Sequence, residues 1–450
     1  MSKDKLIPEI RFPEFKNEGE WDIEKLGVIS EIVRGGSPRP IEDYFTTDVN
    51  GLNWLKIADV HSDAKYITQT KEKVKKEALS STREVNSGDL ILSNSMSFGR
   101  PYILKITTCI HDGWIAIRKI SNKTFEGYLY YFISSESSQS YFQTNAAGAA
   151  VKNLNAEIIK LLPIYLPKNI KEQQKIASCL SSLDEVIAAH SQKLALLKDH
   201  KKGLMQNLFP QRSLNCDSYD LYDENDSKNQ SNHKNQKNPG SDNVPKYRFK
   251  EFEKDGDWVE KSLEEISIKV QDGTHFSPKS FETGDYLYIT SKNVKNGYIE
   301  LSTAQYISTE EHESIYKRSD VRQGDVLLTK DGTIGQACVN ELQIPFSLLS
   351  SVAFIRVKPE FSNYFLYHLL VSQIGQKEIE SQIAGQALKR ITLTKINNFS
   401  FDFPSLQEQQ KIASCLSYLD ALITAQAEKI EQLKLHKKGL MQGLFPKIKD

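Results

Sequence analysis

The chain has 450 residues, of which 39% are hydrophobic, enough for about two to four globular domains. Its 58 basic residues are balanced by 58 acidic ones, so the composition excludes a protein that coats nucleic acid through bulk charge but still allows a local basic face. No apolar run approaches the ~20 residues of a membrane span, and the opening "MSKDKLIPEI" lacks a signal-peptide core, so we expect a cytoplasmic protein.

The cysteines are scattered along the chain and never form a C-x-x-C pair. This spacing is typical neither of a disulfide framework nor of a zinc site. We therefore expect reduced thiols and no metal. The cysteines are Cys109, Cys179, Cys216, Cys338 and Cys415.

Residues 1–168 mix short β-like runs with turns. The β-like runs are "NWLKIADV" (53–60), "GDLILS" (88–93) and "WIAIRKI" (114–120), and a helical pattern covers 128–141. The mixture predicts an α+β domain.

Residues 169–210 predict one long helix. Apolar side chains recur with the alternating 4,3 spacing of a heptad seam, and Pro167 and Pro210 frame the segment. Asn169 and Glu172 have the spacing of a weak capping box. Gly203 leaves two endings open, one at the glycine and one at Pro210. The seam residues expected to pair are Ile176, Leu180, Leu183, Ile187, Leu194 and Leu197.

Residues 211–243 are rich in Asn, Asp, Ser and Lys and have few aliphatic side chains. Such a segment cannot bury enough apolar area to offset its ordering entropy. We interpret it as a flexible linker, with a partly ordered surface loop as the alternative.

Residues 244–404 predict a second α+β domain, and 405–446 a second long helix. The β-like runs are 285–294, 324–329 and 351–358, and a helical pattern covers 364–379. Ser405 and Glu408 form a capping-box pattern after Pro404, and Pro446 follows the helix, with the same ambiguity at Gly439. The second seam comprises Ile412, Leu416, Leu419, Ile423, Ile430 and Leu433.

The two halves repeat each other. The blocks 172–210 and 408–446 both open with "EQQKIASCL" and are identical at 27 of 39 positions. "PEIRFPEFKNEGEW" (8–21) matches 245–258, and "GDLILSNSMSFG" (88–99) matches 324–335, whose last residues, Gly99 and Gly335, we interpret as turn glycines. The chain is therefore one unit used twice, as two tandem domains of related fold.

Two long heptad helices within one chain can pair, and we expect an antiparallel coiled coil. Four polar residues interrupt the seams, and buried polar seam residues fix register at a cost in stability. They are His190, Lys201, Gln426 and Lys437.

The tandem arrangement, the "EQQKIASCLSxLD" helices, the "RFxEF" openings and the "GD(L/V)(I/L)L…G" hairpins resemble the specificity subunit of a type I restriction-modification system. The resemblance implies two target recognition domains, each reading one half of a bipartite, asymmetric DNA site, with an internal pseudo-twofold repeat. It implies that the paired helices set the spacing and dock two methyltransferase subunits, which restriction and translocase subunits join. DNA methylation and host defence follow as expectations.

The sequence lacks the motifs of the chemistry itself. It has no [DN]-P-P-[YF] segment, no F-x-G-x-G loop and no G-x-x-x-x-G-K-[ST] loop. We therefore expect a non-catalytic subunit without a cofactor of its own. Two alternatives stay open: a diverged nuclease or methyltransferase, and a coiled-coil scaffold that assembles partners without recognising DNA.

Candidate DNA contacts are polar residues in or beside loops, because base edges and phosphates are read by such side chains. "ALKRITLTK" (387–395) combines basic residues and threonines, whereas His275 in "DGTHF" has a structural turn role as its alternative. The candidates are Arg34, Ser37, Arg39, Asn94, Arg100, Lys152 and Asn153 in the first domain, and Thr274, His275, Lys330, Thr333, Gln386, Lys389 and Arg390 in the second.

Overall fold

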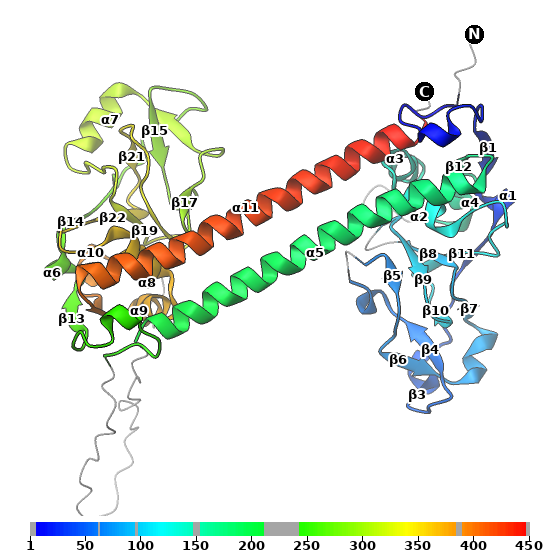
Figure 1. The fold of residues 1–450 in the computed structure, drawn as a ribbon, viewed down its shortest axis with the longest axis horizontal. Coiled ribbons are helices and arrows are strands. Elements are labelled where there is room, and N and C mark those ends of the chain that lie inside the picture. Colours follow the sequence, from blue (N-terminus) through cyan, green and yellow to red (C-terminus); the bar gives the residue numbers. More distant parts are fainter. Residues whose placement is uncertain are drawn as a thin grey trace, which may run out of the picture. The chain divides into compact units, whose positions relative to one another are not determined.

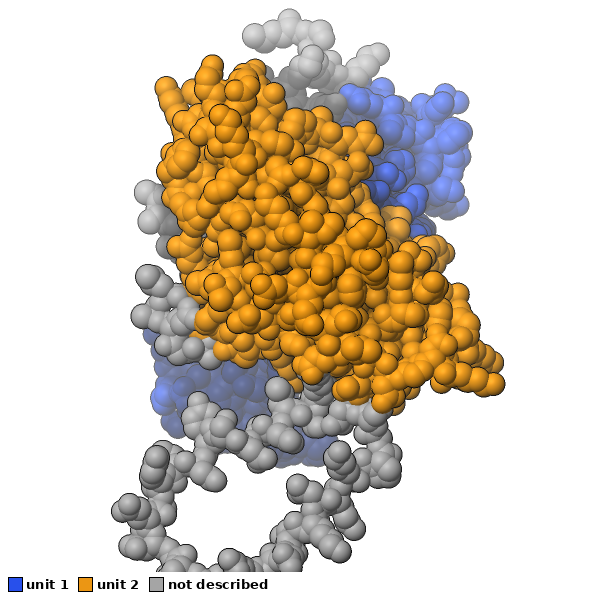
Figure 2. Space-filling view, turned by 90° about the vertical axis from the view of Figure 1, so that its left-hand side faces the viewer, with its two compact units in different colours: residues 1–191, 428–450 blue, residues 192–427 orange. Residues whose placement is uncertain are grey.

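A computed structural model describes residues 6–61, 64–94, 98–146, 154–210, 243–383 and 389–446. The predicted linker 211–243 lies outside these ranges except for Asn243. The chain divides into two compact units, unit 1 with residues 1–191 and 428–450 and unit 2 with residues 192–427 (Figures 1 and 2). Among the described helices, none combines the length and the apolarity that crossing a membrane requires.

Unit 1 holds two five-stranded sheets and a short antiparallel pair, β1 with β12. One sheet has the order β2-β11-β8-β9-β5, and the other has the order β3-β6-β4-β10-β7 with β4 and β10 parallel. Outside the long helices its elements are β1 (Asp22–Lys25), α1 (Leu26–Ile29), β2 (Glu31–Arg34), β3 (Phe45–Thr46), β4 (Leu52–Leu55), β5 (Tyr66–Ile67), β6 (Glu72–Val74), β7 (Arg83–Val85), β8 (Leu90–Ser93), β9 (Pro101–Leu104), β10 (Thr108–Ile110), β11 (Trp114–Arg118), α2 (Glu126–Ser134), α3 (Glu136–Asn145), α4 (Ala156–Lys160) and β12 (Pro163–Leu166).

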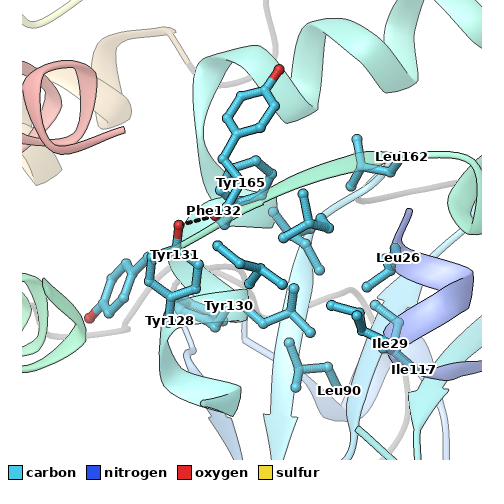
Figure 3. Close-up of a cluster of buried hydrophobic side chains, with 14 of the residues drawn as sticks. Leu26, Ile29, Leu90, Ile117, Tyr128, Tyr130, Tyr131, Phe132, Leu162 and Tyr165 are labelled. Atoms are coloured by element: carbon cyan, nitrogen blue, oxygen red, sulfur yellow. Dashed lines mark hydrogen bonds between the residues drawn. The ribbon is translucent and has the colours of Figure 1, made fainter. Parts of the chain in front are cut away.

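The core of unit 1 forms around α2, whose sequence "GYLYYFI" is apolar or aromatic on every face and is buried throughout. Tyr128 and Phe132 pack against Tyr165 (Figure 3). Both rings also contact Phe445, which lies beyond the end of the chain's last helix. The hydroxyl of Tyr128 donates to the carbonyl oxygen of Tyr165, so its polar tip is satisfied inside the core.

Unit 2 builds a related arrangement from different side chains. Its main sheet has the order β14-β22-β19-β20, a second sheet has the order β18-β15-β21 with β15 and β21 parallel, and two pairs, β13 with β23 and β16 with β17, complete it. Outside the long helices its elements are β13 (Val259–Ser262), α6 (Leu263–Ile266), β14 (Ser267–Asp272), β15 (Tyr286–Ile289), β16 (Val294–Lys295), β17 (Tyr298–Ile299), β18 (Gln305–Ile307), α7 (Thr309–Tyr316), β19 (Val326–Thr329), β20 (Ala337–Val339), β21 (Ser347–Leu348), β22 (Val352–Val357), α8 (Asn363–Val371), α9 (Gln373–Ile383), α10 (Leu393–Asn397) and β23 (Ser400–Phe403).

The predicted α+β class and internal repeat are confirmed. The antiparallel strands β2, β11, β8 and β9 of unit 1 correspond in order to β14, β22, β19 and β20 of unit 2. In the second sheet of each unit two strands pair in parallel, β4 with β10 in unit 1 and β15 with β21 in unit 2, and unit 1 has a further parallel pair, β5 with β9. The predicted helical segments each divide into two consecutive helices, α2 with α3 and α8 with α9.

The two long helices are α5 (Ile170–Leu208) and α11 (Leu406–Leu444). Gly203 and Gly439 lie inside them, so the alternative ending at the glycines is wrong and the helices continue to the turns before Pro210 and Pro446. Helical contacts on either side of a glycine outweigh its propensity cost of about 1 kcal/mol.

The expected capping box at Ser405 is only half formed. Ser405 Oγ accepts a hydrogen bond from the backbone N–H of Glu408 at 3.4 Å, but the Glu408 carboxylate accepts from Arg248 instead of returning to the cap. At the start of α5, Asn169 Oδ1 accepts from the backbone N–H of Lys171, and the Glu172 carboxylate accepts from Arg11. The glutamates therefore join distant segments, a role that the local pattern did not predict.

Each unit contains the start of one long helix and the end of the other. In unit 1, Ile176 and Leu180 of α5 share a core cluster with Leu444 of α11, and Asp184 faces Lys437. The residue numbers therefore run in opposite directions along the two segments. In unit 2, Leu208 clusters with Ile412 and Leu416 in the same antiparallel manner (Figure 1).

Candidate nucleic-acid interface

In unit 1, loops at the ends of three neighbouring strands meet at Asp112. The carbonyl oxygen of Asp112 accepts hydrogen bonds from Arg34 Nε (3.0 Å) and Asn94 Nδ2 (2.9 Å), and its carboxylate accepts from Ser37 Oγ (3.2 Å). Three of the predicted contacts, distant in the chain, are thus brought together by one residue that the sequence did not single out. We call Arg34, Ser37, Asn94 and Asp112 the unit 1 junction.

A recess of about 540 Å³ lies beside the unit 1 junction. Arg39 is exposed at its edge, and the His111 ring lies between Trp54 and Trp114, with ring centroids 6.2 Å apart and tilted by 46° and 57°. Burial lowers the pKa of His111 and outweighs the opposing effect of Asp112, so the ring is neutral near pH 7. Its Nδ1 accepts from the backbone N–H of Gly113. The recess combines cations, a carboxylate and aromatic faces, as surfaces that read nucleic acids do, and is lined by Ser37, Arg39, Trp54, Lys56, His111 and Asp112, among others.

In unit 2, three basic side chains converge on Asp272, whose side chain is 2% exposed. Lys330 Nζ lies 3.1 Å from the carboxylate, Arg318 Nη2 3.1 Å and His275 Nε2 3.4 Å. A buried carboxylate requires such partners, because an unpaired charge away from water is costly. We call Asp272, His275, Arg318 and Lys330 the unit 2 junction.

The two junctions occupy the same place in the repeat. The backbone N–H of Asn94 donates to the carbonyl of Gly113, and that of Lys330 donates to the carbonyl of Ser351 in the corresponding loop. Asn94 thus corresponds to Lys330.

A second pair of backbone bonds extends the correspondence. The N–H of Gly35 donates to the carbonyl of Trp114, and that of Gly273 donates to the carbonyl of Val352. Gly35 therefore corresponds to Gly273, and the residues before them, Arg34 and Asp272, correspond as well. The cation Arg34 of unit 1 is therefore replaced by the anion Asp272 in unit 2, and the amide Asn94 is replaced by the cation Lys330.

Burial changes the reading of three predicted contacts. Asn94, Thr274 and Lys330 are 4%, 5% and 2% exposed, so their side chains do not reach the surface as contacts with DNA would require. Asn94 Nδ2 donates to Asp112, Thr274 Oγ1 accepts from the backbone N–H of Phe276, and Lys330 pairs with Asp272. Each holds a loop in place beneath the surface.

The other predicted contacts in the described ranges keep exposed or half-buried side chains. Thr333 is exposed, although its hydroxyl donates to the carbonyl of Ser291 at 3.0 Å. Arg390 lies 3.8 Å from Asp331, next to Lys330, so the "KRITLTK" segment adjoins the unit 2 junction. Arg100 stacks over Tyr102 at 5.7 Å. Lys152, Asn153 and Gln386 lie outside the described residues.

Sequence reasoning missed Arg318, Asp112 and Lys56. Arg318 follows α7 in a segment that shares little sequence with its counterpart in the first repeat, and its basic charge was the only signal. Within the described ranges, no cluster of three or more His, Cys, Asp or Glu side chains is placed to hold a metal ion. Cys109, Cys179, Cys338 and Cys415 are free thiols.

In each unit, a polar seam residue of one long helix forms an ion pair with an aspartate of the other long helix. In unit 1, Lys437 Nζ lies 2.5 Å from Asp184, which also accepts a hydrogen bond from the hydroxyl of Tyr131 at 2.6 Å. Burial and the bond to Asp184 raise the pKa of Tyr131 far above its usual value, so this hydroxyl remains a donor.

In unit 2, Lys201 Nζ lies 2.5 Å from Asp420, and His368 takes the place of Tyr131. The ring of His368 is fully buried, and its Nε2 lies 2.9 Å from Ser417 Oγ. Burial, followed by the charge of Lys201, lowers the pKa of His368 to about 3, so the ring is neutral at physiological pH.

The remaining predicted seam residues follow the expected pattern of burial. Ile176, Leu180, Ile412, Leu416, Leu419 and Ile430 are buried, and Leu183, Ile187, Leu194, Leu197, Ile423 and Leu433 are half-buried. His190 is half-buried and Gln426 is 8% exposed. Their burial is compatible with helix pairing, which stays a prediction for the individual residues.

Comparisons with known proteins extend over nearly the whole chain. Residues 18–199 and 255–435 match the family described as the type I restriction modification DNA specificity domain. The chain is 22% identical over 445 residues to the type I restriction enzyme MjaVIII specificity subunit of Methanocaldococcus jannaschii, covering 97% of this chain and 93% of that protein. It is 27% identical over 158 residues to the EcoBI specificity subunit of Escherichia coli, or 34% of this chain and 33% of that one.

Two solved structures share the fold. The S subunit of a type I restriction-modification system from M. genitalium superposes with a TM-score of 0.57 at 14% identity, covering 99% of this chain and 100% of that chain. A chain from a study of type I restriction-modification complex assembly gives a TM-score of 0.53 at 18% identity, covering 95% and 97%. With both domain copies matched by the family, the chain belongs to the DNA specificity subunits of type I restriction-modification systems.

Proposed function

We propose that this specificity subunit recognises a bipartite, asymmetric DNA site, one half with each unit, and contributes no catalytic group of its own. The observation that carries the proposal is the pair of junctions. The same strand ends are built twice, yet Arg34 and Asn94 in one copy correspond to Asp272 and Lys330 in the other. The buried partners hold differently charged loops, and the exposed side chains on these loops also differ, with Arg34 and Arg39 in unit 1 and His275 and Arg318 in unit 2. A duplicated frame with different exposed side chains suits two different half-sites.

The long helices support a shared partner. Their repeated blocks are identical at 27 of 39 positions, and Val186 and Leu422, which occupy equivalent places in them, are 42% and 36% exposed. A surface that is kept nearly identical in both copies suits one kind of partner that binds twice. We propose that each helix segment docks one methyltransferase subunit, that the paired helices set the spacing between half-sites, and that restriction and translocase subunits join this complex.

Genome-wide mapping of methylated adenines tests the proposal. The chain is expressed together with its methyltransferase subunit in a host that lacks other adenine methyltransferases. We expect one split motif with two unlike halves and a constant gap. Methylation without such a motif, or a contiguous motif, would contradict bipartite recognition and favour the scaffold alternative.

A catalytically silent methyltransferase subunit provides the control for activity. Paired with an inactivated methyltransferase, the wild-type chain should yield complexes that bind the split motif but leave it unmethylated. Residual methylation in that sample would show that the specificity subunit itself has catalytic activity.

A further inference from the structure

Arg34, the last residue of β2, is held through one nitrogen of its guanidinium and keeps the other two free. Its Nε donates to the carbonyl oxygen of Asp112 at 3.0 Å. Within the described residues, Nη1 and Nη2 have neither a hydrogen-bond partner nor an ion-pair partner, and the residue is exposed. These two nitrogens lie side by side at the end of the planar group, so an intact pair of donors remains for a ligand.

The acceptor that holds Arg34 is itself fixed by other groups. The carbonyl oxygen of Asp112 also accepts from Asn94 Nδ2 at 2.9 Å, and Asn94 is only 4% exposed. The carboxylate of Asp112 accepts from Ser37 Oγ at 3.2 Å instead of forming an ion pair with Arg34. The anchor therefore restricts the arginine without neutralising its charge. When Arg34 is replaced, the carbonyl of Asp112 keeps its other donor.

We infer that Arg34 reads a guanine in the half-site of unit 1, with Nη1 and Nη2 donating to the O6 and N7 of that base. This inference rests on the proposed function. Two parallel donors match two neighbouring acceptors, and guanine presents O6 and N7 side by side in the major groove. The bond from Nε to Asp112 limits the rotamers of the arginine before DNA binds, so less side-chain entropy is lost on binding.

Arg34 also differs from its counterpart in the other repeat. It corresponds to Asp272, because the glycines that follow the two residues make matching backbone hydrogen bonds. Asp272 is 2% exposed, and an ionised carboxylate has no hydrogen to donate to the O6 or N7 of guanine. A residue that reads only one half-site should differ in this way between the units.

The test uses the full chain in complex with its methyltransferase subunits. Methylated adenines are mapped genome-wide for the wild-type chain, for Arg34→Ala and for Arg34→Lys, which keeps the charge but removes the fork. Binding is then measured on duplexes in which the guanine identified by the map is replaced by each other base or by one of two analogues. In 7-deazaguanine the N7 acceptor is missing, whereas hypoxanthine keeps O6 and N7 and lacks only the amino group in the minor groove.

We expect Arg34→Ala to relax one guanine in one half-motif, to leave the other half-motif unchanged and to bind the wild-type site about 10- to 100-fold more weakly. The 7-deazaguanine duplex should weaken binding of the wild-type chain but not that of Arg34→Ala, and hypoxanthine should bind as guanine does. Arg34→Lys should recover the discrimination only in part, because lysine lacks the planar fork.

Lys119→Asn is the matched control. Lys119 Nζ lies 2.8 Å from Glu31, the first residue of β2, so the variant removes a positive charge at the opposite end of the same strand. The side chain of Lys119 is 75% exposed, and its φ of 50° is a conformation that asparagine tolerates. The variant should retain both the motif and the affinity.

Three results would overturn the inference. An unchanged motif in Arg34→Ala, or a relaxed position that is not a guanine, would show that Arg34 does not read this base. An equal loss of affinity on every sequence, with a salt slope reduced by about 1, would assign Arg34 to a phosphate. Equal effects of 7-deazaguanine on the wild-type chain and on Arg34→Ala would place the N7 contact on another residue. A wild-type complex without any split motif would instead contradict the proposed function, so the two failures are distinguishable.

Discussion

The Arg11 guanidinium donates two parallel hydrogen bonds to the Glu172 carboxylate, from Nε at 2.7 Å and from Nη2 at 2.8 Å. The pair is buried, with side chains 5% and 1% exposed, and it joins the "RFPEF" segment to the first turn of α5. Unit 2 repeats the arrangement with Arg248 and Glu408. Because acidic groups favour a helix N-terminus, Glu172 serves both the helix and the salt bridge.

Removing Arg11 should destabilise unit 1 strongly. Arg11→Ala leaves the Glu172 carboxylate buried without its partner, and breaking such a pair costs about 3–5 kcal/mol. We expect faster hydrogen exchange in residues 8–21 and in the first turns of α5, measured on the full chain by mass spectrometry, while unit 2 keeps its wild-type exchange.

Two variants control this experiment. Arg248→Ala should move the effect to residues 245–258 and the first turns of α11. Lys175→Gln removes an exposed ion pair with Glu14, 3.4 Å long, and should leave the exchange of both units unchanged. If Arg11→Ala exchanges like the Lys175 variant, the buried pair does not stabilise unit 1.

Local sequence patterns predicted the α+β class and the long helices, because periodicity and turn residues act over a few positions, and the repeat followed from comparing the two halves of the sequence. The Arg11–Glu172 pair spans 161 positions, so the glutamate was interpreted as a capping residue. No neighbouring residue revealed that its partner would come from the start of the chain.

The candidate site was less predictable for the same reason. Lys330 follows a strand and precedes a turn glycine, as a surface lysine does, and only the fold places it on Asp272. Asn94 was likewise predicted to contact DNA because its side chain is polar, but that side chain donates a hydrogen bond to the carbonyl oxygen of Asp112. Position relative to loops could be predicted, whereas the direction of each side chain depended on distant partners.

Charges placed in the helix seam should prevent assembly. Leu419 is 8% exposed and Leu183 is half-buried, so the double variant Leu183→Asp with Leu419→Asp forces carboxylates into apolar surroundings. We expect the variant to lose co-purification with the methyltransferase subunit. The control Ala188→Asp with Thr424→Asp alters exposed, equivalent positions on the side of the same helices that faces away from Val186 and Leu422, and it should retain the partner. Undiminished co-purification of the leucine variant would contradict a role of the seam in assembly.

His368 should make unit 2 sensitive to mild acid. Its pKa is lowered from 6.5 to about 3 in the folded chain, chiefly by burial. Above pH 6.5 the ring is neutral in both states; between pH 6.5 and 3 only the unfolded chain takes up the proton. As the pH decreases through this range, proton uptake by His368 in the unfolded chain should lower the free energy of unfolding by up to about 1.4 kcal/mol per pH unit.

The wild-type chain is compared with the variant His368→Tyr, which carries the residue type of the corresponding position in unit 1, Tyr131. Lys201, Asp420, Ser417 and Tyr367 surround the ring, and none of them needs to change. The chain is titrated with urea at several pH values between 7.5 and 5, and the folded fraction of unit 2 is measured by pulse proteolysis through peptides from that unit. The result is the slope of the free energy of unfolding against pH. The variant should lose about one proton of pH dependence. Equal slopes in both proteins would show that the histidine is protonated in the folded state.

Replacing Lys389 and Arg390 by alanine should alter only the half-motif that unit 2 reads. Arg390 is 45% exposed beside Asp331, and Lys389 is exposed, so the pair adds positive charge next to the unit 2 junction. Loss of a base contact should relax one position, and loss of a phosphate contact should weaken binding of all sequences and reduce the salt slope by about 1. The control Lys250→Ala with Lys254→Ala removes the same charge from exposed positions in the opening segment of unit 2 and should leave the methylated motif unchanged. Methylation mapping that shows both halves changed, or neither, would contradict the assignment of this segment to one half-site.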